Sequence, residues 1–434
     1  MNASLLEKLG NPETWKAFYR YKASLVCPNW LLEELSAFIA AKKYLPVTAD
    51  IEHGVSFPLP RKAVISKLST QKKRTVYIYP GAYNTVLKCL TWLMLRKYDS
   101  LFAGNLYSFR PGRSAKNAVR RLLRVRDLGS LYAYKADIHD YFNSIPVEAF
   151  LEKLKKALDD DPQLYDFLSG LLSEPRVLED GEPVEEKKGI MAGTPQSSFF
   201  ANLYLAELDR YFEENNLLYC RYSDDIIVFA PTEEEVHQHA QTIRSFLENA
   251  GLSVNPAKEA YSTPAEGFTF LGFSIHERRV DIAPATVKKL KQKMRRKRDA
   301  LTRWQKRSAS DPDRAAAAFI RVFNRKLLES PQDHELSWAS WFFSVINTTD
   351  SLHEIDCYAQ DCLRYLLSGS HNKARFRVKY EDLKALGYRS LVHEYYAAEA
   401  REQREAGADV RARHRAESDA WTQSEADANV KELG

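Results

Sequence analysis

Two adjacent carboxylates, Asp224 and Asp225, stand in a sequence pattern that suits metal chemistry. Tyr222 precedes them, and a run of β-branched and aromatic residues, 226–229, follows them. This pattern predicts a β-hairpin whose tight turn holds the acids and whose flanking strands are buried. An ordinary acidic turn would show the same residues, because Asp is common in turns for its own hydrogen-bonding reasons. The chemistry therefore depends on what lies nearby.

A third carboxylate, Asp137, ends another predicted strand that runs into a turn or short helix. Three carboxylates from a strand end and a hairpin turn suit two Mg²⁺ ions about 4 Å apart, because hard cations prefer oxygen ligands. Such a pair of ions clamps the attacking and leaving oxygens of a phosphoryl transfer. Positioning and charge neutralisation then supply the catalysis.

These stretches resemble the palm of reverse transcriptases. Residues 222–225 match its Tyr-x-Asp-Asp box, and residues 137–142 match its Asp-x-x-x-Tyr-Phe box. The resemblance covers roughly 57–307, with the motifs in the family's order. It implies an α+β right-hand polymerase with fingers, a palm with an antiparallel sheet, a helical thumb, and helical N- and C-terminal extensions. The implied catalytic residues and metal ligands are Asp137, Ile138 through its carbonyl, Asp224 and, as a weaker ligand, Asp225.

The same resemblance implies nucleotide-binding residues in several motifs. A Lys-x-Arg pair in the fingers would grip the triphosphate, and a bulky palm side chain would close over the sugar 2′ position. A Gln would face the nucleotide and the template base, and a later Lys would lie near the leaving pyrophosphate. Ser197 stands where the family usually has Gly, which predicts an altered nucleotide–template fit. The residues at these positions are Lys72, Arg74, Phe142, Gln196 and Lys258.

Contacts to template and primer are predicted from three further stretches. The string 109–114 resembles the second fingers motif of group II intron-like bacterial enzymes, in which Arg110 either holds the fingers together or touches the template. Residues 268–273 resemble the apolar primer grip. Basic residues crowd 288–307 with a single acid among them, as expected for a helix that faces phosphates or, alternatively, solvent. The predicted contacts are Arg110, Arg113, Leu271, Gly272, Lys291, Arg295 and Arg298.

Composition sets the outer limits. The 434 residues include 44% hydrophobic and 12% aromatic residues, and the net charge is +5. This content is enough for real cores and excludes wholesale disorder. The five cysteines are scattered without zinc spacing, and no run reaches the ~18 apolar residues of a membrane span. We therefore expect a soluble, cytoplasmic protein with reduced thiols and no membrane partner.

The predicted organisation has five parts. They are a helical extension over 1–56, fingers over 57–131, a palm over 132–278 with helices over 147–188, a helical thumb over 279–375, and a helical extension with a disordered tail over 376–434. Within these parts, single helices are predicted over 199–212 and 233–250, and residues 315–328 and 337–367 are predicted to be helical.

Together these patterns predict an RNA-directed DNA polymerase that joins a primer 3′ hydroxyl to the α-phosphate of a deoxynucleoside triphosphate. Expected partners are an RNA/DNA duplex, deoxynucleoside triphosphates and a structured non-coding RNA template. Ser197 and the compact helical C-terminal extension most resemble the bacterial reverse transcriptases that defend against phage. Retron, diversity-generating and intron-maturase enzymes are open alternatives. A catalytically silent RNA-binding scaffold is opposed by the three carboxylates, and an RNA polymerase is opposed by Phe142.

Overall fold

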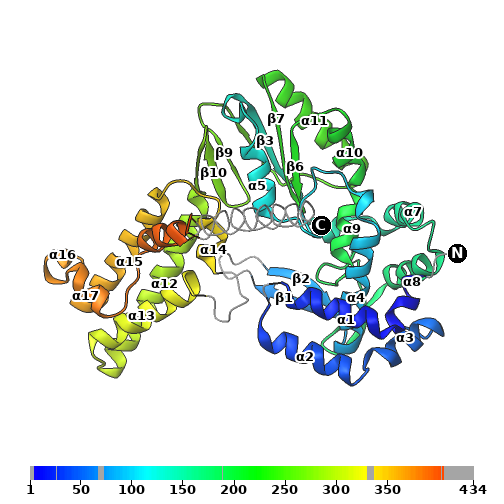
Figure 1. The fold of residues 1–434 in the computed structure, drawn as a ribbon, viewed down its shortest axis with the longest axis horizontal. Helices are drawn as coiled ribbons and strands as arrows, with labels where there is room; N and C mark the ends of the chain where they lie inside the picture. Colours follow the sequence, from blue (N-terminus) through cyan, green and yellow to red (C-terminus); the bar gives the residue numbers. More distant parts are fainter. Residues whose placement is uncertain are drawn as a thin grey trace, which may run out of the picture. The chain divides into compact units, whose positions relative to one another are not determined.

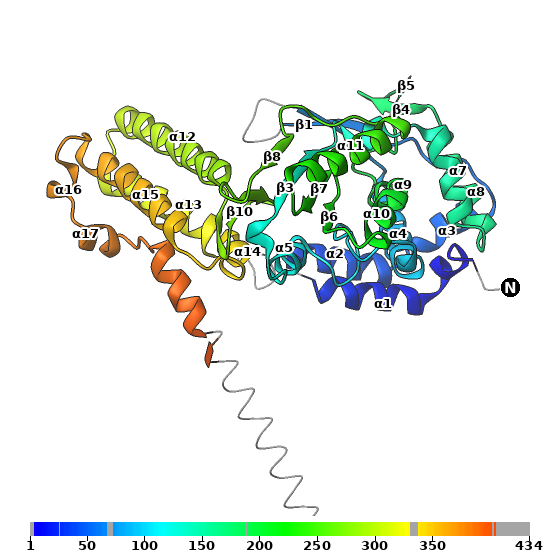
Figure 2. The ribbon, with the colours of Figure 1, turned by 90° about the horizontal axis from the view of Figure 1, so that it is seen from above.

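The computed structural model is an α+β chain built from many helices and three small sheets (Figure 1, Figure 2). It describes residues 4–25, 27–66, 73–187, 189–329, 337–401 and 403–404. The described residues divide into two compact units, one formed by residues up to 289 and the other by residues 290–329 and 337 onward. The segments predicted as N-terminal extension, fingers and palm lie in the first unit.

The palm segment is built on a four-stranded antiparallel sheet in the order β6-β7-β3-β8. Strand β7 is a nearly continuous run of buried β-branched and aromatic residues, as expected for a strand covered on both faces. Helix α11 packs against β7 and β3, and helix α10 packs against β6 (Figure 1). The bounds are β3 Tyr132–Asp137, β6 Tyr219–Tyr222, β7 Asp225–Ala230, β8 Ala260–Ser262, α9 Ser197–Tyr204, α10 Ala206–Glu214 and α11 Glu233–Asn249.

Local sequence signals fix both ends of α11. The Thr232 hydroxyl accepts a hydrogen bond from the Glu235 backbone N–H at 3.2 Å, and Gly251 follows the helix with a φ of +69°. The helix predicted over 199–212 is instead two helices, α9 and α10. The backbone leaves helical geometry between them at Leu205, where φ is −106° and ψ is 16°.

Helices before the palm pack around one aromatic cluster. Trp15 is fully buried, stacks on Tyr44 with ring centroids 4.7 Å apart, and donates its indole N–H to the Leu9 carbonyl at 2.7 Å. The Ser4 hydroxyl donates to Asp161 at 2.7 Å, which ties the start of the described chain to helix α8. The bounds are η1 Glu7–Gly10, α1 Pro12–Ala23, α2 Asn29–Ala40, α3 Tyr44–Glu52 and α4 Gly81–Lys97.

A second sheet, in the order β2-β1-β4-β5, corrects one prediction. Helices were expected throughout 147–188, but α8 ends at Ser173 and β4 and β5 form an antiparallel hairpin. Asp180 and Gly181 make its turn with φ of 51° and 94°, the left-handed pair that an Asp-Gly hairpin turn adopts. The bounds are β1 Arg61–Ser66, β2 Lys73–Ile78, α7 Val147–Ala157, α8 Pro162–Ser173, β4 Arg176–Glu179 and β5 Glu182–Glu185.

Short elements connect these layers. Ser114 caps α5, as its position in the sequence predicts, because its hydroxyl accepts a hydrogen bond from the Asn117 N–H at 3.2 Å. A third sheet has the order β11-β10-β9. The bounds are η2 Asp99–Leu101, α5 Ala115–Leu123, η3 Leu128–Ser130, α6 Tyr141–Ser144, β9 Phe268–Phe270, β10 Phe273–His276 and β11 Arg279–Ile282.

The second unit is built from helices around buried Phe319, Ile355 and Leu363. The helical stretch predicted over 337–367 contains two helices, α14 and α15. Residues 391–401 are also helical, and the predicted disordered tail lies outside the described residues. Among the described residues, no helix has the length and apolar character needed to cross a membrane. The bounds are α12 Pro284–Ser308 (residues 290–308 in this unit), α13 Pro312–Leu327, α14 Trp338–Phe343, α15 Asp350–Ser368, α16 Ala374–Arg377 and α17 Tyr380–Ala385.

Candidate active site

The three predicted carboxylates meet at one end of the palm sheet. Strands β6 and β7 form a hairpin in which Tyr222 pairs with Asp225, so Ser223 and Asp224 make the turn. On the other side of β7, Asp225 is the direct register partner of Asp137, the last residue of β3. The Ile138 N–H donates to the Asp224 carbonyl at 3.0 Å and joins the turn to the strand end. Pairing of the backbone therefore brings residues 88 positions apart in the chain onto one edge, as the two sequence motifs predict.

Charge crowds at this edge. Asp137 is buried, and its Oδ2 contacts the Lys258 ammonium. The Lys135 Nζ lies 3.9 Å from Asp225 Oδ1. Burial, reinforced by the charges of Asp224 and Asp137, raises the pKa of Asp225 to about 6, although Lys135 and Lys258 oppose the shift. The site therefore holds more negative charge than its own lysines neutralise.

The donor set suits a hard cation. Among the described residues, no three His, Cys, Asp or Glu side chains converge closely enough to enclose an ion as they stand. However, Asp137 and Asp225 face each other across β3 and β7, Asp224 adjoins them, and the Ile138 carbonyl adds a neutral oxygen. Carboxylate and carbonyl oxygens are the ligands that Mg²⁺ prefers. The Lys258 ammonium already lies against Asp137, which shows that this edge attracts positive charge.

We expect Asp225→Asn to stabilise the metal-free protein near neutral pH. Because the folded-state pKa is about 6, against an ordinary value of 3.8, the unfolded chain releases this proton first as the pH rises. The folded state is therefore penalised progressively between about pH 4 and pH 6, and the penalty is complete above that range. Removing the charge should raise the free energy of unfolding at pH 7 by about 1–2 kcal/mol, after allowance for solvent screening.

Urea unfolding in EDTA at pH 7 and below pH 4 checks this expectation. The difference between the variant and the wild type should nearly vanish at the lower pH, where both states of the wild type are protonated. An equal difference at both pH values would show that the Asn side chain acts through packing and not through charge.

The predicted nucleotide-binding residues that the structure describes lie in separate segments of the first unit. Gln196 precedes α9 and is buried, and no described residue accepts a hydrogen bond from its Nε2. Phe142 in α6 is 8% exposed, and its ring meets Phe109 edge-on at 6.4 Å. Arg74 lies in β2, and Lys72 lies outside the described residues. Lys258 contacts Asp137, so in this state its ammonium faces the carboxylate cluster.

The loop before α5 contains Arg110, for which the sequence left two alternatives. Its guanidinium is buried and donates to both carboxylate oxygens of Asp99 at 2.8 and 3.0 Å, and also to the Ala103 carbonyl at 2.5 Å. These contacts favour the alternative in which Arg110 holds the fingers together, and the template contact stays a prediction. The Arg113 Nη1 donates to the Gly104 carbonyl at 2.5 Å, while the side chain remains partly exposed.

Sequence reasoning missed a buried ion pair directly beneath the catalytic turn. Arg221 and Asp209 are fully buried, and the guanidinium donates to Asp209 through Nε at 2.7 Å and through Nη2 at 2.5 Å. The remaining donors of Arg221 reach the Asn202 and Ser223 carbonyls, each at 3.2 Å. Ser223 has a φ of +60°, a conformation that non-glycine residues seldom adopt. A charged residue within an otherwise buried strand was the available signal.

The same pair joins the turn to the neighbouring loop. The Tyr219 hydroxyl donates to Asp209 at 3.0 Å, and the Asn105 side chain donates to the Asp209 carbonyl at 2.8 Å. Backbone hydrogen bonds also link Arg221 to Asn105 and Tyr107. The polar network therefore positions β6, α10 and the fingers loop relative to the carboxylate turn.

Residues 65–275, a little under half of the chain, match the sequence profile of the family described as "Reverse transcriptase (RNA-dependent DNA polymerase)". The chain contains a reverse transcriptase domain. Such a domain is an RNA-directed DNA polymerase with the right-hand polymerase fold, as the two palm motifs indicated. The matched span includes Asp137, Asp224 and Asp225.

Known bacterial proteins are similar to part of the chain. Protein YkfC of Escherichia coli K12 is 23% identical over 261 residues, which cover 51% of this chain and 68% of YkfC. The group II intron-encoded protein LtrA of Lactococcus lactis subsp. cremoris is 22% identical over 217 residues, covering 49% of this chain and 35% of LtrA. The retron Ec86 reverse transcriptase of E. coli is 28% identical over 106 residues, covering 24% of this chain and 33% of that enzyme. The chain thus spans about a third of the length of two of these relatives.

Among solved structures, apo telomerase from Candida tropicalis aligns with a TM-score of 0.45 and 13% identity over 74% of this chain and 59% of that chain.

At the end of the reverse transcriptase domain, the predicted primer grip forms the turn of the β9–β10 hairpin. Leu271 and Gly272 have φ of 50° and 89°, so both residues adopt the left-handed conformation of a two-residue hairpin turn. The Gly272 carbonyl accepts a hydrogen bond from the Ala283 N–H at 2.9 Å, which anchors the turn to the chain after β11.

Beyond the domain, the structure separates the three basic residues predicted on the thumb helix α12. The Lys291 ammonium pairs with Glu354 at 2.5 Å, and the Arg298 guanidinium lies 5.1 Å from the centroid of the Tyr365 ring. Both residues are therefore engaged with α15. The Arg295 side chain is 69% exposed and is held only by a 4.0 Å approach to Asp299. Arg295 keeps the exposure that a phosphate contact requires.

Proposed function

We propose that this protein synthesises DNA on an RNA template by joining a primer 3′ hydroxyl to the α-phosphate of a deoxynucleoside triphosphate, with release of pyrophosphate. The observation that carries the proposal is the convergence of Asp137, Asp224 and Asp225 at one end of the palm sheet within a reverse transcriptase domain. Hairpin pairing and strand register fix the backbone positions of the three residues at this edge.

Each residue at this edge has a role in the proposed reaction. Two Mg²⁺ ions, when bound, would supply charge neutralisation for the attacking and leaving oxygens. Asp137, Asp224 and the Ile138 carbonyl would hold them, with Asp225 as the weaker ligand. Lys258, released from Asp137 by the ions, would be free to face the leaving phosphates. Gln196 has a buried amide nitrogen without a described partner, which supports a role against the nucleotide or template base.

An RNA-templated primer extension assay tests the proposal. Purified protein should incorporate deoxynucleotides only with a divalent cation, and incorporation should stop when the RNA template is digested beforehand. Binding of RNA without incorporation under any metal would instead favour a catalytically silent RNA-binding scaffold.

We expect Phe142→Ala to relax discrimination against ribonucleotides. The ring is buried in α6, the short helix that follows Asp137, and a packed aromatic side chain at the nucleotide sugar would reject a 2′ hydroxyl by overlap. An apolar wall rejects an added hydroxyl by about 10² at most, and the variant should lose most of that factor. The ratio of deoxyribonucleotide to ribonucleotide incorporation is the measurement, because it is independent of the folded fraction.

Phe142→Val provides the control for lost stability. Removing a buried Phe ring costs about 3–5 kcal/mol, and the smaller truncation should cost less while still opening the site. If both variants exclude ribonucleotides as strongly as the wild type does, the sugar is read by another residue.

We propose further that the template is a dedicated structured non-coding RNA and that the cytoplasmic enzyme acts in bacterial defence against phage. The helices of the N-terminal extension and of the second unit support the first part, because RNA shape is read through distributed contacts. Sequencing of RNA and attached DNA bound to protein from its native host decides between one dominant RNA and a broad spread. A phage challenge of cells carrying the wild type or the carboxylate variant tests the second part.

The exposed side of α12 should bind phosphates through Arg295. Loss of one phosphate contact should reduce the slope of log affinity against log salt concentration by roughly 0.7–0.9. Arg295→Ala should show this change, whereas Lys291→Ala should leave the slope nearly unchanged, because Lys291 is paired with Glu354. Equal salt slopes for Arg295→Ala and the wild type would show that this side of the helix faces solvent.

A further inference from the structure

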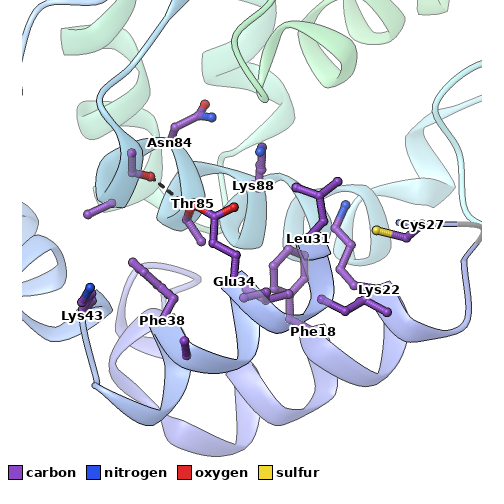
Figure 3. Close-up of a pocket in the computed structure, with 15 residues that line it drawn as sticks. Phe18, Lys22, Cys27, Leu31, Glu34, Phe38, Lys43, Asn84, Thr85 and Lys88 are labelled. Carbon is purple, nitrogen blue, oxygen red and sulfur yellow. Dashed lines mark hydrogen bonds between the residues drawn. The ribbon is translucent and has the colours of Figure 1, made fainter. Parts of the chain in front are cut away.

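A cavity of about 550 Å³ lies among helices α1, α2 and α4, and no residue of the candidate active site lines it (Figure 3). Pockets of this size enclose small-molecule ligands. Leu31 and Phe38 form part of an apolar floor, and both are half-buried. Asn84 and Thr85 add polar groups from α4 (Figure 3). The cavity thus combines an apolar surface with a polar wall.

Three lysines make the cavity electropositive. Lys22 and Lys43 stand toward opposite ends of it, and Lys88 projects from α4 (Figure 3). None of the three forms an ion pair with another described residue, and the Lys22 ammonium lies 5.6 Å from the centroid of the Phe18 ring. Glu34 is the one carboxylate among the lining residues. Positive charge is therefore in excess.

The charges also affect each other. Burial, and after it the charge of Lys88, lower the pKa of Lys22, so the two ammonium groups are close enough to repel. An anion between them would relieve this repulsion and would replace the water that burial removes.

We infer that this cavity binds a phosphate-bearing ligand of nucleotide size, either a free nucleotide or one nucleotide of a bound strand. A phosphate concentrates its charge in one group, which suits lysines that reach one space from different helices, since lysine binds phosphate as a point charge. The apolar floor would take the base. An acidic peptide spreads its carboxylates along a backbone and suits a cavity of this volume less well. The inference goes beyond polymerase activity and does not depend on it, because binding is measured without catalysis.

A cysteine in the cavity wall allows the site to be located directly. Cys27 lines the cavity and is partly buried. Cys357 in the second unit is also partly buried and serves as the reference thiol. Alkylation of each thiol by iodoacetamide is followed by mass spectrometry on the full-length protein in EDTA, which suppresses metal-dependent nucleotide binding elsewhere. AMP, a short single-stranded RNA, inorganic phosphate and an oligoglutamate peptide are the probes. We expect AMP or the RNA to slow alkylation of Cys27 several-fold and to leave Cys357 unchanged.

Matched variants separate a charged site from a general effect. Lys22→Met and Lys88→Met keep the apolar length of the side chain and should each weaken binding about tenfold, the value of one charge-assisted contact. Lys16→Met is the control, because this exposed lysine of α1 pairs with Glu13 outside the cavity. Glu34→Gln should tighten binding, a gain that impaired folding cannot produce.

Each outcome decides a point. Protection by AMP supports a free nucleotide, and protection by the RNA alone supports a nucleotide of a strand. The inference is overturned if no probe protects Cys27, if the oligoglutamate peptide alone protects it, or if inorganic phosphate protects it as well as AMP does. It is also overturned if binding survives in the protein that carries both Lys22→Met and Lys88→Met. A failure of DNA synthesis would leave all of these results unaffected.

Discussion

We expect the protein carrying both Asp224→Asn and Asp225→Asn to lose RNA-templated DNA synthesis while it keeps its fold. Each change replaces an anionic oxygen ligand by a neutral amide at an edge where charge neutralisation is the main catalytic contribution. Removal of one comparable electrostatic group costs on the order of 10²–10³ in rate, so the loss of both carboxylates should exceed that range. Single-turnover primer extension, with product resolved over long incubation times, measures the loss.

The fold should survive because, within the part of the chain that the structure describes, neither carboxylate side chain makes a hydrogen bond that the amide would disrupt. Asp225 Oδ1 lies 3.9 Å from Lys135 Nζ. The raised pKa of Asp225 means that its negative charge destabilises the folded state. The thermal midpoint of the double variant should therefore equal or exceed that of the wild type in EDTA.

Asp140→Asn is the matched control for this experiment. Asp140 lies three residues after Asp137, has a left-handed φ of 40°, and contacts Asn143 on the surface. Asn tolerates the left-handed conformation well, so this change removes one nearby negative charge without backbone strain. DNA synthesis close to wild type is expected. Near-normal synthesis by the double variant, or a comparable loss in Asp140→Asn, would show that the carboxylate edge is not the catalytic centre.

The carboxylate edge could be predicted because each motif encodes its own geometry. Asp224 and Asp225 lie between two short buried strands, and Asp137 ends a third, so local patterning places all three at strand ends. The antiparallel pairing of β3 with β7 then follows from the resemblance to the family, in which the same motifs occur in the same order. The helix stop at Gly251 is local in the same sense, since only the positive φ of one glycine is involved.

Other features depended on contacts that a linear pattern does not contain. The sequence allowed Arg110 to contact either the fingers or the template. Its hydrogen bond to Asp99 depends on how the loop between the two residues folds. The break at Leu205 interrupts an apolar pattern that predicts one continuous helix. In contrast, the Asp180-Gly181 turn carried a strong hairpin signal, and the error there came from extending the preceding helices too far.

The sequence prediction missed the buried pair beneath the turn, although Arg221 within a buried strand was a signal, and this pair leads to the second large effect. Arg221→Met should lower the free energy of unfolding by about 3–5 kcal/mol, because Asp209 would be left as an uncompensated charge in a fully buried site. Asp209→Asn should be costly for the converse reason. Urea denaturation of each variant, analysed with a common slope, gives the values.

A surface ion pair on the same helix supplies the comparison. Lys153 pairs with Glu207 of α10 at 2.6 Å, but the two side chains are 28% and 66% exposed. Exposed pairs contribute about 0–1 kcal/mol, so Lys153→Met should have a small effect. The contrast isolates burial as the cause, since both pairs have a short contact and share α10.

The double variant that combines Arg221→Met with Asp209→Leu tests whether the pair serves stability or position. Replacing both partners of a buried ion pair by apolar residues is often neutral or stabilising, so much of the lost unfolding free energy should return. DNA synthesis should not return with it. In the double variant the Ser223 carbonyl would still lack its hydrogen bond from Arg221 Nη1, which is 3.2 Å long in the wild type. Because Asp224 directly follows Ser223, the loss should disturb the position of Asp224. A protein with restored stability and a lowered kcat at unchanged nucleotide KM would assign Arg221 to positioning the turn. Recovery of both stability and kcat would show that the pair only fills the interior beneath it.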